Sequence, residues 1–212
     1  MQLIYLKLGD YKNLNGLIID FKDNENASVL VGNNGSGKSN IIEAISGIFA
    51  GLYLRSPMKV FKKANQSNYA KKPFNYTMHY EIKNSKVKID YDIITGWKFL
   101  VTQGEEVEIE MSESDFFKRE SELLPSQVIA NYSGEENRLF ELYYKAFYDS
   151  FKKRFIKTGE FSSITQKLYY VNKYFWQLAL LSLIYKEKEG NKDITNFFVN
   201  TLDIQEINEI TF

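Results

Sequence analysis

One short segment constrains this chain more than any other: GNNGSGKS, residues 32–39. It follows a short apolar run, residues 28–31, and leads into apolar residues spaced three and four apart over 41–52. Such a run is typical of a strand buried on both faces, and such spacing is typical of a helix with one buried face. The sequence therefore predicts a strand, a glycine-rich loop and a helix in direct succession.

The segment fits the pattern G-x-x-x-x-G-K-[ST], whose residue types suit phosphate groups. Glycines allow positive φ angles, so that successive N–H groups point inward around an anion, and the following helix adds its positive end. Lys38 supplies a charge for the β- and γ-phosphates, and the Ser39 hydroxyl suits Mg²⁺ as a metal ligand. We expect a phosphate-binding loop formed by Gly32, Asn33, Asn34, Gly35, Ser36, Gly37, Lys38 and Ser39.

The rest of the pattern predicts a mixed α/β chain. Period-two alternation over residues 76–111 indicates an antiparallel meander with one wet face. Short strands are also expected at residues 2–8, 17–21 and 126–131, and helices at 113–124, 138–155, 168–185 and 191–202. The lysine-rich stretch 53–75 reads as an exposed loop or insertion.

Composition excludes several classes of protein. The 27 basic and 27 acidic side chains balance, so the overall charge favours neither presence nor absence of a nucleic-acid partner. The chain has no cysteine and one histidine, His79, which excludes disulfides and clustered cysteine or histidine metal sites. The N-terminus has no signal-peptide pattern, and the apolar stretch 169–185 is read as a buried helix, not a membrane span. We therefore expect a soluble, cytoplasmic protein with no membrane partner.

Residues 8–45, LGDYKNLNGLIIDFKDNENASVLVGNNGSGKSNIIEAI, resemble the opening of ABC-type ATPases of the SMC and recombination-repair group. In that group an "f-R-N-f" turn, a short strand, the glycine loop and a helix follow in this order. The resemblance implies ATP and Mg²⁺ as cofactors. It places Lys12 where the family's Arg or Lys approaches the phosphates, with a solvated turn lysine as the alternative. It also places Asn40 by the α-phosphate.

Residues 124–141, LPSQVIANYSGEENRLFE, are similar to a narrower group, the AAA-family ATPases of restriction, retron and anti-phage systems related to OLD-type nucleases. The chain departs from that pattern by a single Ser before Gly134 and by Arg138 after the acidic pair. The fold class that we expect is α/β: a P-loop NTPase head lobe of the ABC/SMC type. Residues 1–112 would form the nucleotide-binding lobe with its antiparallel β-subdomain, and 113–212 the mostly helical part of the same head.

Hydrolysis requires further groups that this pattern does not supply. An apolar strand ending in Asp-Glu, and the signature motif before it, are not recognisable after residue 50, so the catalytic residues stay unknown. We expect an N-terminal half of an ATPase, truncated before these motifs and poor at hydrolysis alone. The sequence does not decide which glutamine, if any, is the Q-loop residue: Gln103, Gln127 or Gln166.

The resemblance implies a homodimer with ATP sandwiched between two heads when the protein is complete. DNA and an effector nuclease are further partners to consider, in a DNA-repair or phage-defence setting. Five lysines between residues 59 and 72 would suit DNA, although such a run is more often a solvated loop. The alternative is a non-catalytic module that senses nucleotide or docks a partner. A small P-loop kinase ranks last, because the arginines are few and scattered.

Overall fold

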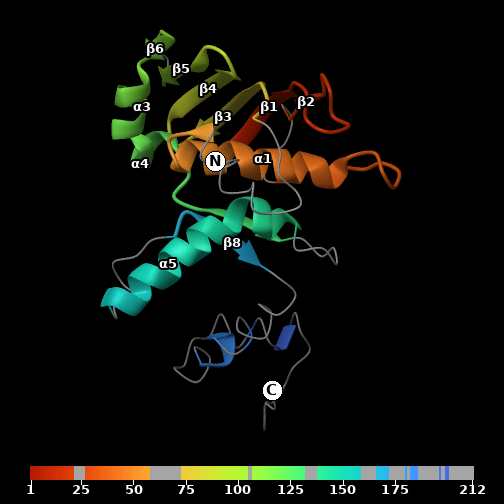
Figure 1. Cartoon of the computed structure of the whole chain (residues 1–212), viewed down its shortest axis with the longest axis vertical. Helices are drawn as coiled ribbons and strands as arrows, with labels where there is room; N and C mark the ends of the chain where they lie inside the picture. The colour runs from red at the N-terminus through yellow and green to blue at the C-terminus, as the bar shows by residue number, and fades with distance from the viewer. Residues whose placement is uncertain are drawn as a thin grey trace. The chain divides into compact units, whose positions relative to one another are not determined.

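The computed structural model describes residues 1–21, 27–57, 73–104, 107–131, 138–158, 166–171, 180, 182–185, 196 and 199–200. The chain divides into two compact units. Unit 1 comprises Met1–Ala130 with Gly134–Tyr170, and unit 2 comprises Asn131–Ser133 with Val171–Phe212. The arrangement of elements below is that of unit 1 (Figure 1).

The central feature of unit 1 is one twisted sheet of six strands. The strands are β1 (Gln2–Leu8), β2 (Ile18–Asp20), β3 (Tyr76–Ile82), β4 (Ser85–Asp92), β5 (Gly96–Gln103) and β6 (Ile109–Met111). Their order is β2-β1-β3-β4-β5-β6, and each neighbouring pair is antiparallel. The predicted meander is confirmed, and the two N-terminal strands extend it into the same sheet because β1 pairs with β3.

The two faces of this sheet differ as the period-two pattern predicts. In β3, Tyr76, Met78, Tyr80 and Ile82 are buried, while the residues between them are half-buried. On the wetter face, Lys88 of β4 pairs with Glu108, which directly precedes β6, and Lys98 of β5 pairs with Glu110 of β6 at 3.2 Å. The buried face forms the core against the helices.

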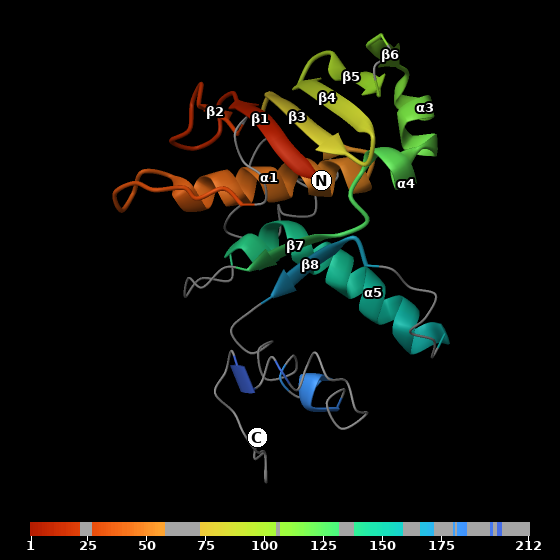
Figure 2. The same cartoon turned by 180° about the vertical axis from the view of Figure 1, so that it is seen from behind.

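Helix α1 (Lys38–Tyr53) covers the buried face of the sheet, and it begins where the glycine loop ends. We expected one buried face, but from Ser46 to Leu52 every residue is buried. The reason is a second layer: a π-helical turn, η1 (Phe140–Tyr144), which continues as α5 (Lys145–Thr158), packs on the other side of α1 (Figure 2). The tyrosines of η1 lie against the small residues Ser46 and Gly47.

Two short helices close the far end of the sheet. They are α3 (Glu113–Lys118), capped by the side chain of Ser112, and α4 (Glu120–Leu123). Phe116 of α3 stacks on Phe99 of β5 with ring centroids 3.9 Å apart. The predicted helix over 113–124 is confirmed, with a break at Arg119.

One predicted helix begins with a strand instead. Residues Leu168–Val171 form β8, which pairs with β7 (Val128–Asn131) in a separate two-stranded sheet. The expectation of a helix starting at 168 is therefore wrong, whereas the strand expected over 126–131 is confirmed. Aromatic and β-branched side chains in Leu-Tyr-Tyr-Val favour a strand once a neighbouring strand offers a ladder. Residues 182–185 are helical, and 172–179 lie outside the described residues.

The strand expected before the glycine loop is also wrong. Residues 28–31 have no assigned secondary structure and belong to neither sheet, and Val29 and Val31 are 83% and 91% exposed. An apolar run of this length becomes a buried strand only where neighbours pair with its backbone and cover it. The described residues supply no such neighbours.

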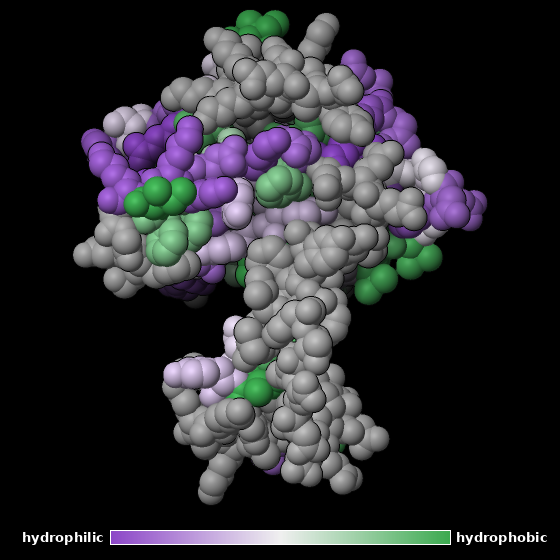
Figure 3. Space-filling model, turned by 60° about the horizontal axis from the view of Figure 1, so that its bottom comes forward, coloured by the Kyte–Doolittle hydropathy of each residue, from purple (hydrophilic) through white to green (hydrophobic). Residues whose placement is uncertain are grey.

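Several expectations fall outside the described residues: the lysine cluster at 59–72, the Ser-Gly-Glu-Glu turn at 133–136 and most of the helix at 191–202. Over unit 1, the face in Figure 3 carries mainly hydrophilic side chains, with hydrophobic ones in small separate groups. Within the described part of the chain, no helix has the length and apolar character needed to span a membrane.

Candidate phosphate-binding site

The loop before α1 takes the backbone shape that its glycines allow. Gly35 and Gly37 have φ angles of 84° and 99°, in the left-handed region that residues with a Cβ rarely adopt. The N–H of Ser36 donates to the carbonyl of Asn33 at 3.2 Å, which turns the chain sharply. The loop therefore curves back on itself directly before the helix.

The ammonium of Lys38 closes this curve. It donates to the carbonyl oxygens of Gly32 (2.5 Å) and Asn33 (2.8 Å), so the first helical residue reaches back to the start of the loop. Because Lys38 opens α1, its charge lies at the helix end whose backbone N–H groups have no partner within the helix. Gly37, at the cap position, provides no capping side chain, and the first turn holds no acidic residue.

The turn between β1 and β2, residues 11–14, packs against the loop. A Cβ at Gly37 would lie 2.5 Å from Cδ2 of Leu14, so glycine is required for this approach. The amide of Asn13 donates to the carbonyl of Gly35 at 3.2 Å and accepts from the amide of Asn40 at 2.7 Å. Asn13 thus joins the turn to both the loop and the first turn of α1.

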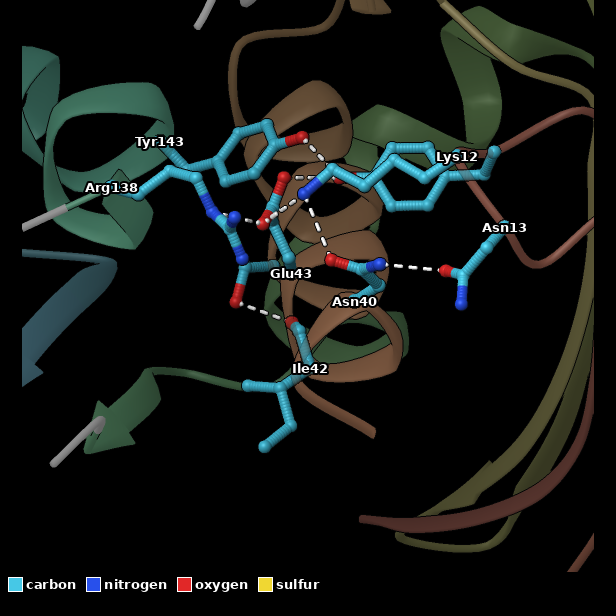
Figure 4. Close-up of polar contacts among 9 residues, drawn as sticks. Lys12, Asn13, Asn40, Ile42, Glu43, Arg138 and Tyr143 are labelled. Atoms are coloured by element: carbon cyan, nitrogen blue, oxygen red, sulfur yellow. Dashed lines mark hydrogen bonds and ion pairs between the residues drawn. The ribbon is translucent and has the colours of Figure 1, made fainter. Parts of the chain in front are cut away.

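Lys12 points from the same turn toward α1 (Figure 4). Its ammonium donates to Oδ1 of Asn40 at 2.9 Å and to Oε2 of Glu43 at 2.5 Å. The side chain is 15% exposed, so the alternative of a solvated turn lysine is wrong. Lys12 itself has φ 54°, an uncommon backbone conformation for a side chain of this size. The structure therefore brings the predicted residues Lys12 and Asn40 together.

Glu43 is the centre of the surrounding contacts. Its side chain is 2% exposed, and both oxygens accept hydrogen bonds. The Tyr11 hydroxyl donates to Oε1 at 2.7 Å, while Lys12 and Arg138 Nε (3.0 Å) share Oε2. The Tyr143 hydroxyl lies 3.1 Å from that of Tyr11 and extends the network into η1 (Figure 4).

The network holds its tyrosines neutral. Burial, and after it the neighbouring Tyr143 and Glu43, raises the pKa of Tyr11 far above the ordinary value of 10.0. Burial also raises the pKa of Tyr143, although its hydrogen bond with Tyr11 works in the opposite direction. The Tyr11 hydroxyl therefore keeps its proton and remains a hydrogen-bond donor at any ordinary pH.

Sequence reasoning missed Glu43, Tyr11 and Tyr143, and treated Arg138 only as a departure from a family pattern. One signal for Glu43 was available: an acidic residue in the same helix as Asn40, three positions further on, followed at three and four positions by the small residues Ser46 and Gly47. Small residues on one side of a helix permit close packing of another element. Arg138 had no such signal, because its distance from Glu43 along the chain is large.

Other polar residues, among them His79 and Gln166 from the sequence analysis, make their contacts elsewhere. Asp90 accepts a hydrogen bond from Thr77 at 2.6 Å, and Asp92 accepts from the backbone N–H groups of the next turn. His79 stacks on Tyr5, and burial, with Lys88, lowers its pKa. Among the glutamines, buried Gln166 donates to the carbonyl of Leu168. Among the described residues, no group of three or more acidic or histidine side chains is arranged to hold a metal ion.

Fold and loop together define a mixed α/β protein with an antiparallel sheet and a phosphate-loop motif at a helix start. Known proteins resemble this chain over short segments. The chain is similar to a retron Ec83 probable ATPase of Escherichia coli, 50% identical over 40 residues, which cover 19% of this chain and 7% of that protein. It is also similar to the DNA replication and repair protein RecF of Citrifermentans bemidjiense and of Geobacter sp. (strain M21).

Each RecF match is 39% identical over 67 residues, which cover 32% of this chain and 16% of the relative. The chain thus matches only a small part of the length of these relatives. No family model matches it. These short matches support a P-loop ATPase family over a part of the chain, while the roles of individual loop residues stay predictions.

Proposed function

We propose that this chain binds ATP with Mg²⁺ through residues 32–40, as the nucleotide-binding part of an ABC-type ATPase. The observation that carries the proposal is the geometry at the start of α1. Two glycines at positive φ turn the loop toward a helix end without a capping side chain, and Lys38 lies across it. Backbone N–H groups, helix dipole and ammonium then act on one anion.

Residues 32–40 and their neighbours fit a bound triphosphate with Mg²⁺. Adding a Cβ at Gly37 would fill the space against Leu14, and no acidic side chain in the first turn of α1 opposes an anion there. Loop residues 32–37 would surround the phosphates, with Lys38 as their counter-charge. Ser39 would offer its hydroxyl to Mg²⁺, and Asn40 and Lys12 would lie beside the phosphates.

Calorimetric titration of the full chain with ATP, with and without Mg²⁺, tests this proposal. Lys38→Met should weaken ATP binding about 10- to 100-fold, because a charged hydrogen bond contributes about 1.5–3 kcal/mol. Lys98→Met is the matched control, since Lys98 pairs with Glu110 on the sheet and should leave binding unchanged. Equal ATP affinity in wild type and Lys38→Met would contradict the proposal. GTP titrated in parallel gives the base preference.

Ser39→Ala separates the metal from the phosphates. It should reduce the gain in affinity that Mg²⁺ provides, while binding of metal-free ATP stays near that of wild type. We further propose that this chain alone hydrolyses ATP poorly, which the missing Asp-Glu strand in the sequence supports. Phosphate release comparable to that of complete ATPases, abolished by Lys38→Met, would contradict this part.

Head-to-head dimerisation and DNA binding belong to the same proposal, supported by the similarity to a DNA replication and repair protein. Light scattering with and without Mg-ATP, and a DNA mobility assay under the same conditions, test these two points. The rival function, a module that senses nucleotide and docks a partner, predicts tight ATP binding without hydrolysis in any assembly.

A further inference from the structure

Two cations share one buried carboxylate oxygen beside the proposed phosphate site. Oε2 of Glu43 accepts from the Lys12 ammonium at 2.5 Å and from Nε of Arg138 at 3.0 Å. Lys12 comes from the turn between β1 and β2, and Arg138 from the residues directly before η1. Elements far apart in the sequence therefore bring both charges to a single oxygen.

Because Glu43 is buried, the loss of a cation from its carboxylate is costly. The Glu43 side chain is 2% exposed, against 15% for Lys12 and 25% for Arg138. A carboxylate with so little access to water is strongly destabilised if its counter-ion leaves, because solvent does not replace the lost partner. A lysine that is the sole cation of such a group would be held in place and would not be available to a ligand.

Lys12 also points toward the loop. Its ammonium contacts Asn40 in the first turn of α1, two residues after Lys38. A phosphate held by the loop would therefore compete with Glu43 for the same ammonium. Whether Lys12 leaves Glu43 for a phosphate depends on which hydrogen-bond donors and cations still contact Glu43 after Lys12 has left.

We propose that Arg138 is a positioning residue for nucleotide binding: it neutralises Glu43 and thereby allows Lys12 to move from Glu43 to the phosphates. After this exchange Glu43 keeps Arg138 on Oε2 and the Tyr11 hydroxyl on Oε1. The buried carboxylate thus remains compensated. The inference rests on the proposed binding of ATP at residues 32–40 and assigns no chemical step to Arg138.

Because Arg138 lies two residues before Phe140, the first residue of η1, the same contact ties the nucleotide site to the layer on the other side of α1. Tyr143 of η1 reaches Tyr11, and Tyr144 lies 2.9 Å from the Ser46 hydroxyl. These contacts hold η1 against α1, so Arg138 is presented to Glu43 by a packed element and not by a freely moving side chain. π-Helical turns of this kind occur frequently at functional sites.

A double-mutant cycle on ATP affinity tests the role of Arg138. Arg138→Met should weaken binding about tenfold or more in the wild-type background, because the departure of Lys12 then removes the second of the two cations that the described contacts give Glu43. In a Lys12→Met background the same change should alter affinity by less than about twofold. Arg138→Lys, which keeps the cation, should bind ATP nearly as well as wild type. An equal loss in both backgrounds would overturn the proposal, since Arg138 would then act without Lys12.

The ATP affinity of Glu43→Gln is a second test of the role of Arg138. A neutral side chain at this position imposes no penalty when Lys12 leaves, so ATP affinity should equal or exceed that of wild type. Arg138→Met should have no further effect in this background. A loss of affinity in Glu43→Gln as large as in Lys12→Met would overturn the proposal, because Glu43 would then be holding Lys12 in its working position. Circular dichroism on every variant verifies that the fold is kept.

A measurement without nucleotide separates this inference from the proposed function. Acylation of the Lys12 amine by a small anhydride is followed by mass spectrometry. Lys12 should react more slowly in Arg138→Met, where Arg138 no longer shares Glu43 with it. It should react faster in Glu43→Gln, and as in wild type in Arg138→Lys. If ATP does not bind to the wild-type chain, the proposed function fails while this order still tests the sharing of Glu43. Rates that do not respond to either change overturn the sharing itself.

Discussion

Leu14 lies directly over Gly37, at the point where the glycine loop becomes helix α1. A Cβ on Gly37 would stand 2.5 Å from Leu14 Cδ2, and Gly37 has a φ angle of 99°. The turn between β1 and β2 thus packs closely on the loop because Gly37 has no side chain. Sheet, loop and helix are connected at this contact, and it explains why the turn holds Lys12 and Asn13 at the candidate site.

Gly37→Ala should destabilise the chain for two separable reasons. The positive φ alone costs a residue with a Cβ about 1–2 kcal/mol, and the clash with Leu14 adds to this. Gly96→Ala is the matched control, because Gly96 has φ 87° and no atom lies within 4 Å of the position that a Cβ would take there. Urea unfolding should rank Gly37→Ala below Gly96→Ala, and Gly37→Ala should cost less stability in a Leu14→Ala background than in the wild-type background. Equal stability of the two single variants would contradict this account.

Two glycines inside α1 should respond to alanine in opposite ways. A Cβ at Gly47 would lie 3.0 Å from ring atoms of buried Tyr143, whereas at Gly51 it would meet Pro57 at 3.4 Å, an ordinary contact. Gly47→Ala should therefore cost about 1–3 kcal/mol through overpacking against η1. Gly51→Ala should be neutral or stabilising by up to about 1 kcal/mol, since alanine favours helices. Thermal unfolding of both variants measures the contrast, and a stabilising Gly47→Ala would show that η1 does not pack here.

Alkaline pH should unfold the chain through its buried tyrosines. Burial raises the pKa of Tyr144 from 10.0 to about 12, and burial raises the pKa of Tyr80 and Tyr143 as well. Above pH 10 the unfolded chain releases these protons while the folded chain retains them. Stability is therefore fully present below pH 10 and is lost as the pH rises toward the folded values.

The midpoint of urea unfolding, measured in steps from neutral pH to about 12, shows this loss. Tyr144→Phe should make the dependence shallower, because it removes one of the contributing groups. Tyr148→Phe, at an exposed position, serves as the control and should leave the slope unchanged. A dependence that Tyr144→Phe does not alter would assign the alkaline transition to other residues.

Packing of α3 on the sheet depends on Phe116. Its ring stacks on Phe99 at 3.9 Å and is fully buried. Phe116→Ala should lower the free energy of unfolding by about 3–5 kcal/mol, and Phe116→Leu by less, because leucine fills part of the space. Ile94→Ala, at a residue 93% exposed, should change stability by no more than about 0.5 kcal/mol. A small loss for Phe116→Ala would mean that α3 is not docked as described.

Local patterns predicted most of the elements that position the site. Alternation over 76–111 predicted β3 to β6, and apolar spacing predicted α1, since each pattern reports how neighbouring residues face one core. The same reasoning failed at 28–31 and at 168–171. Both segments are short and apolar, and whether such a segment becomes strand, helix or exposed chain depends on which partner lies beside it.

The candidate site divides in the same way. By itself, the sequence determined the glycine loop, the lysine and serine that follow it and the helix that they begin, because these residues act through spacing along the chain. Only the tertiary structure decided that Glu43 is buried and that Lys12, Arg138 and Tyr11 meet on its carboxylate. The burial of Glu43 and the sharing of its charge both depend on segments that are distant in the sequence, and only packing brings those segments together.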